Sequence, residues 1–70
     1  MQVLKRIWLI NKRTEKGLSQ KQLAEVCDTT QMTISNIENG TRRPSPELAQ
    51  KLAKKLNFEW TIFYETKVKN

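Results

Sequence analysis

The spacing of apolar residues over residues 19–40 predicts two short helices joined by a tight turn. The first helix begins at Gln20, because Ser19 can act as its N-cap and Gln22 can complete a capping box. Its inward-facing residues are Leu23, Ala24 and Cys27. The turn that follows contains Asp28, a residue type that tolerates the left-handed backbone conformation better than most.

The second helix covers residues 31–39, and its two faces differ in chemistry. Thr30 is its N-cap, Gly40 supplies the left-handed residue that ends it, and Ile34 and Ile37 point inward. The opposite face, spread over about 140°, carries Gln31, Met32, Ser35, Asn36 and Asn39. It lacks the Lys and Glu that usually cover a solvated helix. Its amides, hydroxyl and thioether suit base edges and the thymine methyl group, whereas an ordinary polar surface is the alternative interpretation.

A helix is also predicted for residues 3–16, which contain good helix formers and no Gly or Pro before Gly17. Its inward face is ambiguous, because the apolar residues do not share one helical line. We expect three core residues, Ile7, Leu9 and Ile10, and one partly buried aromatic residue, Trp8.

The chain from residue 45 onward predicts one clear helix and one uncertain segment. Ser45-Pro46-Glu47 is a strong helix start, with an N-cap, a proline in the first turn and an acidic residue. The inward stripe of this helix consists of Leu48, Ala49, Leu52, Ala53 and Leu56, and Asn57 ends it. The β-branched and aromatic residues of segment 58–64 would suit a strand. Their spacing would also suit a short helix, which we expect over residues 59–65.

Length and charge narrow the class of partner. The 70 residues allow one domain with a small core, residues 1–66, followed by a loose tail, residues 67–70. With 13 Lys and Arg against 7 Asp and Glu, the net charge is +6, which points first to nucleic acid and second to a membrane surface. The adjacent Arg42 and Arg43 either clamp phosphate or form a solvated basic turn. Gln20 and Lys21 are further phosphate candidates, since a helix N-terminus attracts anions.

Several other classes of function are disfavoured. No apolar run approaches the roughly 20 residues that a membrane span needs, so we expect no membrane partner. The single Cys cannot form an internal disulfide, which favours a reducing, cytoplasmic setting. There is no His, no carboxylates are paired for acid–base chemistry, and Cys27 is best interpreted as a small buried hydrophobe. We therefore expect no catalytic activity, no metal, no cofactor and no small-molecule substrate.

Four short motifs stand in register over residues 17–40: Gly-Leu-Ser-Gln, Leu-Ala, Thr-Ile-Ser and Glu-Asn-Gly. With the basic loop, a proline and the helix LAQKLAKKLN that follow, they resemble the phage repressor/Cro helix-turn-helix family, often called XRE-like. The resemblance covers residues 4–65. It implies an all-α, five-helix domain that binds double-stranded operator DNA as a homodimer, with residues 31–39 as the recognition helix in the major groove.

The resemblance also implies roles for individual residues. Base edges or the adjoining backbone would lie near Thr30, Gln31, Met32, Ser35 and Asn36. Gln20 and Asn39 would hold phosphates, and Arg42 and Arg43 would meet phosphate or the flanking minor groove. Arg13 and Glu38 match a partly buried ion pair that joins the helix predicted for residues 3–16 to the recognition helix. Asp28 and Met32 depart from the pattern, because many members have Gly at the first position and a polar base reader at the second.

The end of the chain suggests how two copies could associate. Phe58, Trp60 and Phe63 add more aromatic surface than a core of this size hides easily, so we expect them at a homodimer interface. The leading hypothesis is a sequence-specific transcriptional regulator of bacterial or phage origin that acts by occupying its operator. Of the two modes of regulation, repression is the one we expect. The alternative is a protein-binding module of the same fold, either an antitoxin or a regulator held by an antagonist protein.

Overall fold

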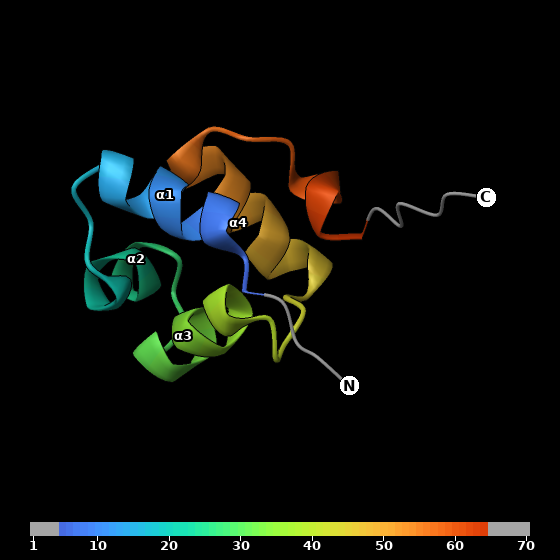
Figure 1. The fold of residues 1–70 in the computed structure, drawn as a ribbon, viewed down its shortest axis with the longest axis horizontal. Coiled ribbons are helices and arrows are strands. Elements are labelled where there is room, and N and C mark those ends of the chain that lie inside the picture. The colour runs from blue at the N-terminus through green and yellow to red at the C-terminus, as the bar shows by residue number, and fades with distance from the viewer. Residues whose placement is uncertain (1–4, 65–70) are drawn as a thin grey trace.

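The computed structural model describes residues 5–64, which form four α-helices and one 3-10 helix (Figure 1). The elements are α1 (Ile7–Glu15), α2 (Gln20–Val26), α3 (Gln31–Asn39), α4 (Pro46–Leu56) and η1 (Trp60–Tyr64). No strand occurs within this range, which confirms the all-helical expectation. Residues 3 and 4 of the expected first helix, residue 65 of the expected last helix and the expected tail at 67–70 lie outside the described residues.

The expectation of five α-helices is wrong, because the last segment, η1, is a 3-10 helix. Asn57 ends α4 in the left-handed conformation, with φ of 63°. The residues of η1, Trp-Thr-Ile-Phe-Tyr, are all β-branched or aromatic and have low α-helix propensity. A tight 3-10 turn suits such a short run, and packing rather than propensity holds it in place.

The helices are arranged so that α1 and α4 cover one side of α2 and α3 (Figure 1). The chain after α4 runs back along the molecule, so that η1 lies beside the first turn of α4. The hydroxyl of Tyr64 donates a hydrogen bond of 2.6 Å to the carbonyl oxygen of Pro44 and fixes this return. Among the described helices, none is both long and apolar enough to cross a membrane.

Local capping explains where α2 and α3 begin. The hydroxyl of Ser19 accepts from the backbone N–H of Gln22, whose side chain accepts in turn from the backbone N–H of Ser19, as predicted. The hydroxyl of Thr30 accepts from the backbone N–H of Thr33 in the same way at the start of α3. These bonds satisfy backbone donors that have no partner inside the helix, so both starts are encoded locally.

The turn between α2 and α3 depends on one left-handed residue, Asp28, with φ of 60°. After it, the backbone N–H of Thr29 donates to the carbonyl oxygen of Ala24 over 2.9 Å and closes the end of α2. Gly40 ends α3 with φ of 83°, as predicted. The two left-handed residues therefore set the directions in which the chain enters and leaves α3.

The start of α1 and the phase of its inner face differ from the prediction. The helix begins at Ile7 instead of near residue 3, because Arg6 is held in a non-helical conformation by bonds to α3. Leu9 is buried and Trp8 is partly buried, as predicted, and Ile10 is also partly buried. Ile7 is 53% exposed, so its assignment to the core is wrong. The inner face is centred on Leu9, and at about 100° per residue Ile7 lies almost opposite.

The core joins all five elements. Its buried members are Leu9, Leu23, Ala24, Cys27, Ile34, Ile37, Ala49, Leu52, Leu56 and Phe63. The ring of Trp8 lies 5.1 Å from that of Phe58 and 5.4 Å from that of Phe63, between centroids. Phe63 is only 5% exposed, so the reasoning that placed it on an exposed aromatic surface is wrong. Trp8 supplies the partner ring that the sequence argument overlooked.

Candidate nucleic-acid interface

The two faces of α3 are separated as the sequence predicts. Ile34, Ile37 and Glu38 are buried against the other helices. The residues of the opposite face are exposed (Gln31, Met32 and Asn39) or partly exposed (Ser35 and Asn36), and the N-cap Thr30 beside them is exposed. Met32 has 72% of its surface exposed, the largest value among the exposed large apolar residues. A thioether is thus presented to solvent at the middle of a face made of amides and hydroxyls.

A buried carboxylate anchors this face to the first two helices. The Nε of Arg13 lies 2.6 Å from Oε2 of Glu38, and its Nη2 lies 3.3 Å from Oε1. The two side chains are 12% and 1% exposed, so this is the partly buried pair that the resemblance implies. Arg13 also donates to the carbonyl oxygen of Leu18 over 2.8 Å. Its charge and most of its donors are therefore satisfied where water is largely excluded.

Gln20 carries this network to the surface. Its side-chain N–H donates to Oε1 of Glu38 over 2.9 Å. The side-chain amide of Gln31 donates to Oε1 of Gln20 over 3.5 Å, a long and weak bond. The first residue of α3 is therefore oriented by α2, and α2 in turn is oriented by the buried ion pair.

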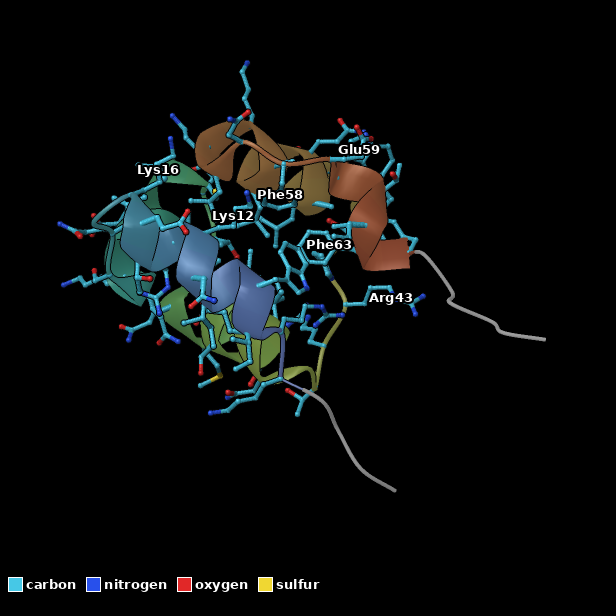
Figure 2. The ribbon with its side chains drawn as sticks, turned by 45° about the horizontal axis from the view of Figure 1, so that its top comes forward. Lys12, Lys16, Arg43, Phe58, Glu59 and Phe63 are labelled. Carbon is cyan, nitrogen blue, oxygen red and sulfur yellow. The ribbon has the colours of Figure 1, made fainter. Side chains whose placement is uncertain are left out.

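The basic loop after α3 is shaped by the end of that helix. Both the backbone N–H and the hydroxyl of Thr41 donate to the carbonyl oxygen of Asn36, over 3.0 and 3.1 Å. Arg42 and Arg43 follow and are exposed. The guanidinium carbon of Arg43 lies 5.7 Å from the ring centroid of Tyr64, a cation–π distance. Figure 2 shows Arg43 beside η1, well away from Lys12 on α1 and from Lys16 at its C-cap.

Most cations near α3 have no acidic partner. Within residues 5–64 the ion pairs are Arg13–Glu38 and the exposed Lys51–Glu47 pair, at 3.8 Å. Lys21, in the first turn of α2, is exposed and belongs to neither pair. Asn39, at the end of α3, is exposed and its side chain bonds weakly to the hydroxyl of Ser35 over 3.5 Å. Lys21, Arg42 and Arg43 are therefore exposed cations that have no acidic partner within residues 5–64, and the two arginines directly follow the end of α3.

This arrangement matches a known family. The chain fits the family described as helix-turn-helix over residues 9–63, which include the whole of α2 and α3. The chain belongs to the XRE-like helix-turn-helix family.

Two relatives of this helix-turn-helix protein carry informative names. It is 43% identical over 60 residues to the uncharacterized HTH-type transcriptional regulator YqaF of Bacillus subtilis (strain 168), and the match spans 86% of this chain and 79% of that protein. It is 42% identical over 45 residues to the competence pilus inhibition repressor of Acinetobacter baylyi (strain ATCC 33305 / BD413 / ADP1). That match spans 64% of this chain and only 41% of the repressor. The helix-turn-helix domain is a DNA-binding regulatory domain in this family.

One residue at the interface of this helix-turn-helix domain was missed by the sequence argument. Arg6, just before α1, donates through Nη1 to the carbonyl oxygens of Ile37, at 2.6 Å, and Arg42, at 3.0 Å. Burial, and next the charge of Arg43, lowers the pKa of the Arg6 guanidinium, which still stays charged at neutral pH. No local pattern marks it, because both acceptors are backbone atoms more than 30 residues away.

A polar groove of about 300 Å3 lies between the α2–α3 turn, the basic loop and the start of α4. Its lining mixes acids, Asp28 and Glu47, with bases, Arg42 and Lys51. Burial raises the pKa of the Cys27 thiol at its edge, against the opposing effect of nearby lysines, so this thiol is protonated at neutral pH. No three metal-binding side chains converge anywhere in residues 5–64.

Proposed function

We propose that this protein is a sequence-specific transcriptional repressor that binds operator DNA as a homodimer and inserts α3 into the major groove. One observation carries the proposal: an exposed helix face of amides, hydroxyls and a thioether is followed by exposed arginines that have no acidic partner among residues 5–64. The family and the printed names of both relatives, a transcriptional regulator and a repressor, support the same function.

The proposed roles follow the position of each residue. We assign base edges or the adjoining backbone to Thr30, Gln31, Met32, Ser35 and Asn36. We assign phosphates to Gln20, Lys21, Asn39, Arg42 and Arg43. Because Met32 has no strong donor or acceptor, its proposed contact is a thymine methyl group. Gln31 is the first candidate for direct readout, because a glutamine amide can pair with adenine through two hydrogen bonds and this exposed one stands at the start of α3.

The proposed homodimer would use the surface after α4. Phe63 is a core residue of the protomer, which leaves Phe58 and Trp60, both partly buried, and Ile62, exposed, as the apolar residues available there. A single half-site contact would give weak binding, whereas two half-sites about 34 Å apart would be occupied together. Footprinting on a selected operator should therefore protect two half-sites one helical turn apart. Protection of one isolated half-site would contradict the dimer.

The decisive experiment is selection of bound sites from random DNA, followed by affinity measurements on the selected operator and on random duplex. Gln31→Ala should weaken operator binding by about 1–3 kcal/mol and leave random duplex almost unchanged. Gln50→Ala, at an exposed position of α4 on the same chain, is the matched control and should change neither affinity. Equal losses on both duplexes would move the readout role to Ser35 or Asn36.

Wild-type protein that prefers no sequence would refute the repressor proposal. In that case the protein-binding module becomes the better hypothesis, and the exposed Met32 becomes a candidate contact for a toxin or antagonist protein. Copurification with the product of a neighbouring gene, followed by loss of the complex in Met32→Gln, would test that alternative. The same variant on operator DNA tests the proposed thymine contact.

A further inference from the structure

Arg6 contacts three parts of the molecule that are distant in sequence. Its backbone N–H donates to the carbonyl oxygen of Glu38 over 2.7 Å. Its side chain donates to the carbonyl oxygen of Ile37, in the last turn of α3, and to that of Arg42, in the basic loop. Its guanidinium carbon lies 5.4 Å from the ring centroid of Phe63 in η1.

Each of these contacts has a physical reason. The last carbonyl groups of an α-helix lack partners inside the helix, and the negative end of the helix dipole attracts a cation there. A planar guanidinium can stack on an aromatic ring while its N–H groups donate in the plane. Because Phe63 is buried and fixed by Trp8 and Phe58, it gives the guanidinium a rigid support.

The basic loop has few other restraints. Thr41 is bonded to Asn36 at one end of the loop, and Pro44 accepts from Tyr64 at the other. Between them, among the described residues, the backbone of Arg42 and Arg43 is held by the single hydrogen bond from Arg6. The same nitrogen of Arg6 donates to Ile37, so the loop is fixed relative to the end of α3.

We propose that Arg6 is a positioning residue that fixes the basic loop against the end of α3, so that Arg42 and Arg43 meet the same DNA as the exposed face of α3. The expected effect of Arg6 on DNA affinity rests on the proposed DNA-binding function, whereas the contacts of Arg6 with the loop and α3 do not depend on it.

The alternative is that Arg6 is one more phosphate contact. A double-mutant cycle separates these two roles of Arg6. If Arg6 itself contacts phosphate, the losses of affinity caused by removing Arg6 and Arg43 should add. If Arg6 positions the loop, the loss caused by removing Arg43 should be smaller when Arg6 is already absent. Arg6→Met is the informative variant, since its aliphatic chain can still cover Phe63 while the charge and both hydrogen bonds are lost. Lys5→Met removes the same charge from the exposed neighbouring residue and serves as the matched control.

Arg6→Met should weaken operator binding by about tenfold, more than Lys5→Met does. Arg43→Met should then cost about threefold less in the Arg6→Met background than in wild type, and its cost should be unchanged in the Lys5→Met background. Arg6→Lys, which keeps the charge and one or two donors, should restore part of the affinity. Additive losses from Arg6→Met and Arg43→Met would overturn the proposal.

A second measurement uses the free protein. The backbone N–H groups of Arg42 and Arg43 donate no hydrogen bond among the described residues, so the mobility of this loop is best followed by 15N relaxation. The {1H}–15N NOE of both residues should fall in Arg6→Met, and to a smaller extent in Arg6→Lys, with no change in Lys5→Met. An unchanged NOE in a folded Arg6→Met protein, checked by circular dichroism, would also overturn the proposal. Because no DNA is present, this measurement tests the positioning role of Arg6 even if the wild-type protein prefers no operator. Failure of the positioning role can therefore be told apart from failure of the repressor function.

Discussion

The buried carboxylate of Glu38 allows a sharp test of what holds α3 in place. Glu38 is 1% exposed and accepts three hydrogen bonds, two from Arg13 and one from Gln20. In Glu38→Gln one oxygen can still accept, but the new NH2 group faces donors of Arg13 or Gln20. The variant therefore leaves the guanidinium of Arg13, itself only 12% exposed, without a counter-charge.

The size of the effect follows from that burial. Removing one partner of a buried ion pair costs about 3–5 kcal/mol. The lower end is appropriate here, because Arg13 keeps its bond to the carbonyl oxygen of Leu18. A loss of about 3 kcal/mol would lower the Tm of a domain of this size by roughly 12 °C or more, and would remove roughly a fifth to three fifths of a typical stability of about 5–15 kcal/mol.

Urea unfolding followed by circular dichroism and tryptophan fluorescence would measure this loss. Glu47→Gln breaks the exposed pair with Lys51, where the glutamate side chain is 82% exposed, and should change stability by no more than about 0.5 kcal/mol. The double variant Arg13→Met/Glu38→Leu should recover much of the loss, because it removes both charges from the buried site. A Glu38→Gln protein as stable as Glu47→Gln would refute the idea that the pair is structural.

Two further predictions concern the loop and the turn. Arg43→Ala should weaken binding to operator and random duplex alike, because a phosphate contact carries no sequence information, and should reduce the slope of log affinity against log salt concentration by about one. Lys54→Ala, at an exposed position of α4, is the control, and an unchanged slope in Arg43→Ala would exclude the phosphate contact. Asp28→Gly should stabilise the protein by up to about 1 kcal/mol in urea unfolding, because φ of 60° is unfavourable for a residue with a Cβ. A destabilised variant would mean that interactions of the aspartate side chain outweigh the cost of this backbone conformation.

The parts of the fold that the sequence predicted well are those determined locally. The caps at Ser19, Thr30 and Ser45 involve residues close to each other in the chain, and all are present. The left-handed conformation of Asp28 agrees with the tolerance of its residue type and with the family resemblance, in which many members have Gly at this position. Such features need no knowledge of how the helices pack.

The parts that differed depend on contacts between distant segments. The start of α1 is set by bonds from Arg6 to Glu38, and no local signal in residues 3–6 reports them. The phase of α1 depends on which residue meets the core, which is why Ile7 was misplaced. The burial of Phe63 requires Trp8, more than 50 residues earlier in the chain. For the candidate site, the exposed face of α3 came from helical spacing, the Arg13–Glu38 pair came from the family resemblance, and Arg6 was found only in the structure.

The division of α3 into a buried and an exposed face has a consequence for how such a protein diversifies. Met32 and Asn36 contribute nothing to the buried core, so substitutions there can alter which DNA is preferred with little penalty in folding. Gln31 is different, because Gln20 connects it to Glu38 and hence to the interior. Descendants of one ancestral gene could therefore acquire new operators most easily through Met32 and Asn36. A change at its first residue would be accepted more readily when Gln20 changes with it.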